Sequence, residues 1–402
     1  MTGHLRGAMV RNPLCRQVAV VGLGCTDYGR DLGRSQGRLA VEACINALND
    51  AGISVSEVDG LCGNANQASP QYVQEGLGIP ELAWWSTPPI PFSLLLNEAA
   101  NAVFSGACEV AIAYQAQFRS AATSRSAREL DFIRAVPDPN RTADPHRIAQ
   151  FTQPYGRRSS GYPGFMRRYM DRYSAPREAF GRIAINSRTN ATRNPHAIAR
   201  KPLTLADYQA SRMVREPMCL LDMDYPVDGA DAVVIVTSER ARDLPQRPVF
   251  IEASTFGQTE HPQAETYIDL DHTGQEVAAR RLWAKTDLSI DDVDVFYPYD
   301  GFTVITLKWF ESMGFCAPGE AAGFVSDHWD EQEQCLRIFG RMAVNTHGGS
   351  LSEGATQGAG HIREAVTQLR GQAMDRQVDG AGVALLGVGG LFNNSTALLL
   401  ST

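Results

Sequence analysis

Two short polar segments in the second half of the chain carry the residue types that acid–base chemistry needs. One is Tyr-Asp-Gly-Phe at positions 299–302, and the other is Asn-Thr-His-Gly-Gly-Ser-Leu-Ser-Glu-Gly-Ala at positions 345–355. Tyrosine, aspartate, histidine and glutamate can each pass a proton to or from a substrate held within hydrogen-bonding reach. The glycine pair, Gly348 and Gly349, lets backbone amides approach a bound carbonyl oxygen. These segments predict a site that moves protons and stabilises negative charge on oxygen.

Tyr299 is the first candidate for the base or the proton donor, and Asp300 is expected to orient or polarise it. Both residues also fit structural roles. Tyr299 could belong to the core beside Tyr297, and an aspartate before an apolar run commonly caps a helix. We favour a catalytic role for Tyr299 and leave both roles open for Asp300.

His347 and Glu353 flank the glycine pair and are expected to relay a proton. A packing histidine fits poorly before two glycines, which favours a site role for His347, whereas Glu353 fits a bond to the loop backbone equally well. Phe302 and His361 complete the set as substrate-binding candidates, together with the two glycines. His361 also fits an ordinary polar position on a helix.

Charge and cysteine content exclude several classes of protein. The chain has 402 residues and a net charge of −8, which argues against nucleic-acid binding. Its eight cysteines are scattered without a C-x-x-C pair, so neither a metal site nor a disulfide framework is expected. With no long apolar run and no apolar signal core near the start, the sequence predicts a cytoplasmic protein without a membrane span.

The chain contains an internal duplication. Each copy has a short apolar strand pattern, a helical pattern and a Val-Asp pair at matching spacing. The copies are residues 17–22, 39–51 and 58–59, and residues 248–253, 277–285 and 293–294. Alternating strands and helices favour mostly parallel sheets covered by helices. We therefore predict an α/β protein with two halves, residues 1–240 and 241–402.

An irregular region at about 118–173 is expected to be an insertion in the first half. It holds eleven arginines, no lysine and five prolines. Guanidinium groups suit phosphate, so one interpretation is a cap over an anionic ligand such as CoA. A solvated loop that faces another subunit is an equal alternative.

Several segments resemble the thiolase superfamily, and in particular its sterol carrier protein branch. They include Tyr-Ser-Ala-Pro-Arg-Glu at 173–178, Asp-Met-Asp-Tyr-Pro-Val-Asp-Gly-Ala-Asp-Ala-Val at 222–233 and the glycine loop at 345–355. The resemblance covers the chain from about Val18 to Leu400. It implies a duplicated, five-layered αβαβα fold whose halves are related by a pseudo-twofold axis. It also implies a homodimer built by edge-strand pairing, for which the apolar run 108–113 is the candidate strand.

The catalytic residues of thiolases are missing from the matching positions. The segment Thr-Pro-Pro-Ile at 87–90 holds no cysteine, Ala355 replaces the catalytic histidine, and Gly387 replaces the second cysteine. The family's Asn-Glu-Ala-Phe falls on Tyr-Asp-Gly-Phe at 299–302. Thiolysis and Claisen condensation need a cysteine thioester and a base, so thiolase activity is rejected.

One branch of the family resembles this chain in these respects, namely the lipid-transfer-protein-type aldolases of bacterial steroid side-chain degradation. The resemblance implies retro-aldol cleavage of a bulky β-hydroxyacyl-CoA, with the CoA thioester as substrate and no cofactor. It also implies a small partner protein with a zinc ribbon and an oligonucleotide-fold (OB-fold) barrel that binds acyl-CoA.

Ala355 departs from this branch too, because many of these aldolases place a second tyrosine there. Tyr299 and His347 could suffice, His361 could substitute, or the pocket could fit another substrate. The alternative function is a catalytically silent thiolase-like subunit that binds or scaffolds acyl-CoA.

Overall fold

The protein is described by a computed structural model that covers residues 12–63, 68–88, 91–119, 161–259, 270–391 and 394–402. The duplication predicted from the sequence is visible as two series of elements in the same order. The first series is β1 (Val18–Cys25), α1 (Gln36–Ala51), β2 (Gly60–Cys62), β3 (Trp84–Ser86), α3 (Phe92–Ser105), β4 (Ala111–Phe118) and β7 (Asp228–Thr237). The second is β8 (Val249–Gln258), α10 (Gly274–Trp283), β9 (Val295–Pro298), β12 (Met342–Val344), α14 (Ala359–Leu369), β13 (Val383–Leu391) and β14 (Asn394–Ser401).

The remaining elements lie between and around these series. The helices are α2 (Pro70–Leu77), α6 (Gly161–Tyr173), α7 (Arg177–Thr192), α8 (Leu205–Gln209), α9 (Ser238–Ala241), α11 (Thr303–Met313), α12 (Ala321–Asp327) and α13 (Gly349–Ser352). Short 3-10 turns are η1 (Val55–Glu57), η3 (Leu220–Asp222), η4 (Ile290–Asp292) and η5 (Met374–Arg376). The additional strands are β5 (Met213–Arg215), β6 (Met218–Cys219), β10 (Trp329–Asp330) and β11 (Cys335–Ile338).

The strands of the two halves are hydrogen-bonded in the same order. The first half runs β3-β2-β4-β7-β1 and the second runs β12-β9-β13-β14-β8. In each half the first three strands are parallel and the next two pairings are antiparallel. The halves join where β1 pairs with β8 through Ala19 and Val20.

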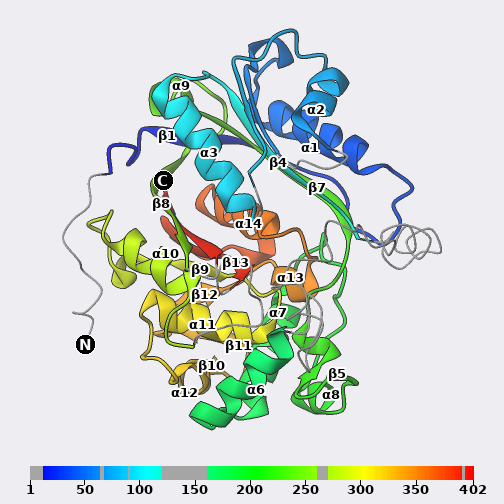
Figure 1. Ribbon diagram of the computed structural model, residues 1–402, viewed down its shortest axis with the longest axis vertical. Coiled ribbons are helices and arrows are strands. Elements are labelled where there is room, and N and C mark those ends of the chain that lie inside the picture. Colours follow the sequence, from blue (N-terminus) through cyan, green and yellow to red (C-terminus); the bar gives the residue numbers. More distant parts are fainter. Residues whose placement is uncertain (1–11, 64–67, 89–90, 120–160, 260–269, 392–393) are drawn as a thin grey trace, which may run out of the picture.

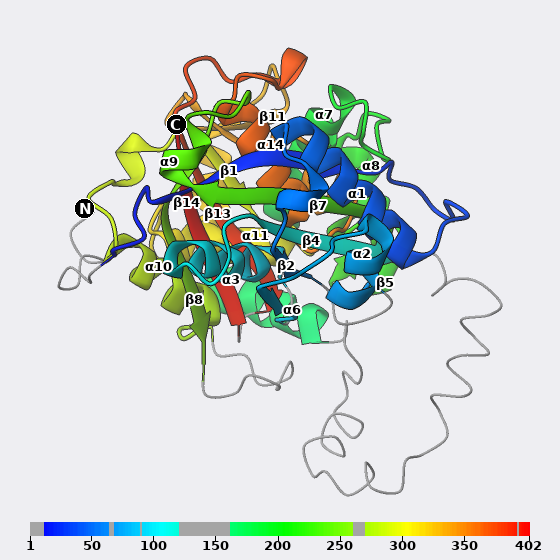
Figure 2. The ribbon, with the colours of Figure 1, turned by 90° about the horizontal axis from the view of Figure 1, so that it is seen from above.

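Helices cover both sheets and fill the space between them. α3 and α14 contact strands of both halves, whereas α1 packs on the first sheet and α10 and α11 pack on the second. Figures 1 and 2 show α3 and α14 between the two sets of strands, with α1 and α2 outside one set and α10 and α11 outside the other. The predicted five-layered αβαβα arrangement is confirmed. The division at residue 240 stays a prediction.

The repeated Val-Asp pair has a structural reason. The Asp59 carboxylate accepts backbone N–H bonds from Glu109 and Val110, at 2.8–2.9 Å. The Asp294 carboxylate accepts the equivalent bonds from Gly382 and Val383, at 2.8 and 2.9 Å. Each aspartate thus ties the start of one parallel strand to the start of its neighbour. The spacing repeats because the same turn is built twice.

Two expectations from the sequence are wrong. Residues 161–173, which were expected to be irregular, form helix α6, while residues 120–160 lie outside the described part of the chain together with seven of the eleven arginines. The run 108–113 does not form an edge strand, because β4 is paired with β2 on one side and β7 on the other. Within the described residues, the outer strand of that half is β3.

Candidate active site

The predicted site residues come together at the carboxyl ends of the parallel strands in the second half. Tyr299 and Asp300 follow β9, and the loop from Asn345 to Glu353 follows its parallel neighbour β12. His361 lies in the first turn of α14, which packs against β9 and β13. Ligands in open α/β sheets commonly bind at this end of the strands.

Asp300 is the hydrogen-bonding centre of the site. Its side chain is fully buried and accepts the Ser350 N–H at 2.6 Å, the Ser187 hydroxyl at 3.0 Å and a bond from His361 Nε2 at 3.0 Å. A Cβ on Gly349 would lie 1.9 Å from the carboxylate, which explains why this position needs glycine. Asp300 does not cap the next helix, because the N-cap of α11 is Phe302.

His361 is a buried residue of α14 that hydrogen-bonds to the Asp300 carboxylate. With Nε2–H donating to Asp300, the neutral ring keeps its lone pair on Nδ1, and an aspartate that fixes the tautomer is how many catalytic histidines are oriented. The His361 ring lies 5.6 Å from the Tyr299 ring and 4.7 Å from the His347 ring. The arrangement makes His361 a candidate base, whereas the sequence alone had suggested a substrate-binding or ordinary helix residue.

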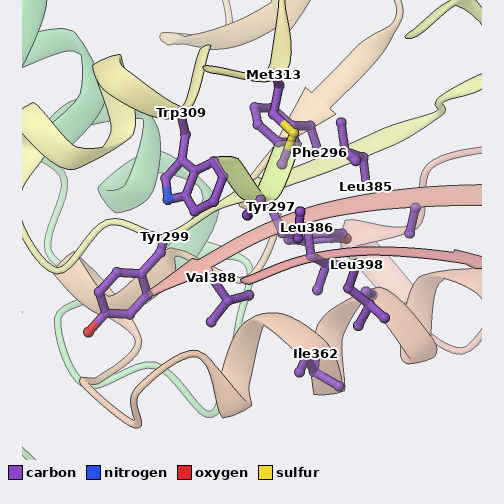
Figure 3. Packing of buried hydrophobic residues seen from close by; sticks show 14 of the residues in the cluster. Phe296, Tyr297, Tyr299, Trp309, Met313, Ile362, Leu385, Leu386, Val388 and Leu398 are labelled. Atoms are coloured by element: carbon purple, nitrogen blue, oxygen red, sulfur yellow. The ribbon is translucent and has the colours of Figure 1, made fainter. Parts of the chain in front are cut away.

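Tyr299 is positioned as a proton donor rather than a base. Figure 3 shows its ring at the margin of the apolar cluster around Leu385 and Leu386, with the hydroxyl directed away from that cluster. Burial, and then the nearby Asp224 carboxylate, raise the pKa of Tyr299 well above its ordinary value, although Arg119 opposes this. Its phenol is therefore protonated near neutral pH and can hydrogen-bond to a developing oxyanion.

The Arg119–Asp224 ion pair is the feature that the sequence analysis missed. The Arg119 guanidinium donates to Asp224 at 2.9 Å, and the Asp224 N–H donates to the Gly301 carbonyl at 3.0 Å. Arg119 follows β4 of the first half, so this half supplies a cation beside Tyr299. The available signal was Asp224 in the segment that resembles thiolases, but only folding brings it next to position 301.

His347 is deeply buried and neutral. Burial, followed by His361 and Arg363, holds the pKa of His347 well below its usual range. Neither ring nitrogen has a hydrogen-bond partner among the described residues, and Nε2 lies 3.9 Å from Glu353 Oε2. This geometry places His347 and Glu353 together, as predicted. Both side chains are buried, and the His347 ring contacts the His361 ring.

Glu353 is held by two side chains from different elements. Its Oε1 accepts bonds from Asn194 at 2.8 Å and from Arg363 at 2.6 Å, and burial raises the pKa of this carboxyl. Its partners make Glu353 an anchor of the loop. The Gly348 N–H donates to the Asn345 carbonyl at 2.9 Å, so that amide is not available for a thioester oxygen.

Phe302 forms part of an aromatic wall next to Tyr299. Its ring stacks on Tyr162 of α6, with ring centroids 4.1 Å apart and planes 21° apart. The region at 118–173, which was expected to be an insertion in the first half, therefore contributes directly to the site through α6. A stacked aromatic pair offers an apolar surface to a bulky ring substrate.

One position of a missing thiolase residue, that of Gly387, is closed by another side chain, whereas residues 89 and 90 of the segment that replaces the nucleophile lie outside the described part of the chain. A Cβ on Gly387 would lie 2.5 Å from the Trp309 ring, and α3 begins at Phe92 with Pro91 as its N-cap. All eight cysteines are free, and burial raises the pKa of thiols such as Cys15, to about 11. Such thiols are poor nucleophiles. Within the part of the chain that is described, no helix could span a membrane and no three side chains gather as metal ligands.

Comparisons with known proteins show which family and fold the chain shares. The family described as "Thiolase C-terminal domain-like" matches residues 257–402. The 17-hydroxy-3-oxo-4-pregnene-20-carboxyl-CoA lyase of Mycobacterium tuberculosis is 36% identical over 378 residues, which cover 90% of this chain and 94% of the lyase. The steroid side-chain-cleaving aldolase of Thermomonospora curvata is 35% identical over 373 residues, or 90% of this chain and 92% of the aldolase.

A solved structure titled "Ltp2-ChsH2(DUF35) aldolase" matches with a TM-score of 0.83 and 32% identity, covering 97% of this chain and 99% of that chain. A monomeric SCP2-thiolase-like protein of Mycobacterium smegmatis shares the fold, with a TM-score of 0.70 at 17% identity over 98% of this chain and 78% of that chain. The chain belongs to the thiolase superfamily, in the branch of steroid side-chain-cleaving acyl-CoA aldolases.

Proposed function

We propose that this protein is a carbon–carbon lyase that cleaves a bulky β-hydroxyacyl-CoA, a steroid side-chain CoA thioester, by a retro-aldol reaction. The products are a ketone or aldehyde and a short acyl-CoA. The observation that carries the proposal is the buried Asp300–His361 pair beside a protonated Tyr299, in a site without an activated thiol. Both the lyase from M. tuberculosis and the aldolase from T. curvata support the reaction class.

The residues can carry out each step of this reaction. His361 Nδ1 removes the proton from the β-hydroxyl, and its own Nε2–H bond to Asp300 stabilises the imidazolium that forms. The bond between the α and β carbons then breaks, leaving a carbonyl product and a thioester enolate. Tyr299 donates a hydrogen bond to the enolate oxygen, and the α carbon takes the proton back from His361. Protons and electrons balance without any further reagent.

Arg119 and Asp224 set the charge around the phenol. Asp224 keeps Tyr299 protonated, and Arg119 compensates the negative charge that develops during the reaction. Phe302 and Tyr162 provide the apolar wall on which a steroid ring packs. Glu353 holds the loop through its bonds to Asn194 and Arg363, and His347 packs against the His361 ring, so neither residue is assigned a contact with the substrate.

Three further parts of the proposal concern assembly and location. A small acyl-CoA-binding partner with a zinc ribbon and an OB-fold barrel is supported by the match to an aldolase whose structure includes ChsH2(DUF35). A homodimer in the cytoplasm is consistent with the resemblance to thiolases. The short outer strand β3 carries Trp85, which is 52% exposed, and is the place for edge pairing of two copies.

The proposal is tested by incubating the purified chain with a β-hydroxyacyl-CoA that carries a steroid ring system. The assay follows release of the short acyl-CoA by mass spectrometry, with and without the co-purified small protein. Cleavage that disappears in His361→Gln but persists in Cys25→Ala supports the mechanism. No cleavage under either condition would favour the silent acyl-CoA-binding alternative, and a covalent acyl-cysteine adduct would contradict the retro-aldol reaction.

A further inference from the structure

A polar cavity lies beside the loop that follows β12. It has a volume of about 180 Å³, and its wall extends from Arg341, before β12, to Thr346, after it. Tyr299, Asp300 and His361 are not among the residues that line it. The cavity is therefore separate from the site around Asp300 and His361, although the same loop borders both.

Four arginines line this cavity. Arg193 comes from the end of α7, Arg337 from β11, Arg341 from the turn before β12, and Arg376 from η5. Figures 1 and 2 show α7 and β11 next to each other, and the two elements are in contact. A chain with a net charge of −8 thus gathers four guanidinium groups from separate segments around one hollow.

The guanidinium groups are fixed in orientation, and they keep N–H donors that are not hydrogen-bonded within the described residues. Arg341 donates to the Val293 and Asp291 carbonyls, each at 2.6 Å, which fixes its orientation. The side chain of Arg337 makes no hydrogen bond or ion pair with any residue in the described part of the chain. Each guanidinium has five N–H donors, so donors remain for a ligand.

Carboxylates near the cavity do not cancel this charge. Arg193 pairs with Glu333 at 2.7 Å, and Arg341 lies 3.7 Å from Asp294, but these side chains are 32–43% exposed, and such surface pairs are weak. Asp375 lines the cavity and is exposed. Among the wall arginines, only Arg376 is tightly neutralised by a buried carboxylate, that of Glu364, at 2.9 Å.

Glu364 also links the cavity to the glycine loop at 345–355. It accepts the Thr346 hydroxyl at 2.8 Å, and Thr346 is both a wall residue of the cavity and the neighbour of His347. A ligand that competes with Glu364 for Arg376 therefore acts on a bond to the loop that holds His347. This gives the cavity a physical connection to the site around Asp300 and His361.

We infer that this arginine cavity binds a phosphate group. Planar guanidinium forks match phosphate oxygens in two-point hydrogen bonds, and a cavity of this size accepts a phosphate ester rather than a whole cofactor. The phosphate has two possible sources, a separate phosphorylated metabolite or the phosphates of CoA. Only the second source rests on the proposed function.

The test is calorimetric titration of the purified full-length chain with inorganic phosphate at low ionic strength. Arg337→Gln removes an unpaired wall guanidinium, so its folding is expected to be unchanged, which circular dichroism checks. We expect phosphate binding to weaken about tenfold or more, because a charge-assisted hydrogen bond to the ligand is lost. Arg38→Gln, the same substitution on the exposed face of α1, is the matched control and should bind like the parent.

Two results would overturn the inference, namely no heat of binding by the parent protein up to about 10 mM phosphate, or equal binding by the Arg337→Gln and Arg38→Gln variants. A second titration, with CoA, identifies the source. If Arg337→Gln weakens CoA binding and phosphate competes with CoA, the cavity holds a CoA phosphate. If phosphate binds to the CoA-saturated protein with unchanged affinity, the ligand is a separate metabolite. Both of these results require the phosphate site, and neither depends on whether the protein cleaves a β-hydroxyacyl-CoA.

Discussion

The two halves of the molecule share a framework but not a chemistry. Asp59 and Asp294 make the same turn bonds, and β2 and β9 occupy the same place in their sheets. After β9 the chain continues into Tyr299 and Asp300, whereas after β2 it continues into Gly63, where a Cβ would meet the Tyr114 ring at 2.1 Å. The two halves thus share the aspartates that join neighbouring strands, but they differ in the residues that follow the carboxyl ends of the strands.

The first half still contributes to the site through charged side chains. Arg119 reaches Asp224 beside Tyr299, and Asp231 of β7 binds Arg363 at 2.8 Å, which in turn holds Glu353. In the proposed mechanism, the second half thus carries the proton-transfer groups, and the first half sets the electrostatic surroundings. Substitutions in matched positions of the two halves can separate these contributions.

The largest expected effect comes from removing proton-transfer groups of the second half. Tyr299→Phe and His361→Gln should each lower kcat by at least about 10²-fold, because a positioned acid or base contributes about 10²–10⁴-fold. His347→Ala should cause a smaller fall, since His347 lies behind His361. Steady-state kinetics of acyl-CoA release measure these changes.

The matched control is Tyr114→Phe in the first half, which deletes a buried phenol that donates to the Ala68 carbonyl at 2.8 Å. We expect its kcat to stay within about threefold of the parent. A fall in Tyr114→Phe equal to that in Tyr299→Phe would contradict the assignment of chemistry to one half.

A large stability effect is expected when the second thiolase cysteine is restored. Gly387→Cys should cost about 1–3 kcal/mol of unfolding free energy, because the added side chain overlaps the Trp309 ring. The control is Gly382→Cys in the same segment, where the nearest contact of a Cβ is 3.8 Å. Urea unfolding measures both, and a fully stable Gly387→Cys variant would show that Trp309 does not close this position.

The shared framework is tested by equivalent substitutions in the two turns. Asp59→Ala and Asp294→Ala each leave two backbone N–H groups without their carboxylate, and each should cost about 1–3 kcal/mol. Urea unfolding of the two variants should give similar losses. A loss confined to one of them would mean that the halves are tied together by different bonds.

The smallest effect concerns the pH dependence of folding stability and His196, which lies shortly after α7. Burial, and then Arg363, lower the pKa of His196 to about 4, so the unfolded chain binds a proton there more readily than the folded one. Folding stability should therefore fall as the pH drops from about 6.5 towards 4. Buried Asp231 and Glu353 act in the opposite direction, because their pKa values are raised.

Comparison with His196→Gln isolates the histidine from these carboxylates. The melting temperature of the variant, relative to the parent, should rise as the pH falls through this window. A constant difference between the two proteins from pH 7 to pH 4 would mean that His196 titrates normally in the folded state.

Much of the fold could be predicted because its signals are local or periodic. The strand and helix patterns and the Val-Asp spacing each follow from short segments, and they appear in the structure. The glycine at position 349 was predicted to let a backbone amide approach a substrate, and in the structure its missing side chain leaves room for Asp300. The edge strand was predicted wrongly because β4 pairs on one side with β2, which lies much earlier in the chain, and on the other with β7, more than a hundred residues later.

The sequence by itself determined the α/β duplication, the family and the loss of thiolase chemistry, since these depend on the types and spacing of residues along the chain. Only the tertiary structure decided which of the polar residues act together. The bond between His361 and Asp300 joins residues 61 positions apart, and the Arg119–Asp224 pair spans 105. Such pairs leave no periodic signal in the sequence, because their geometry is set by how the two sheets and the helices between them pack.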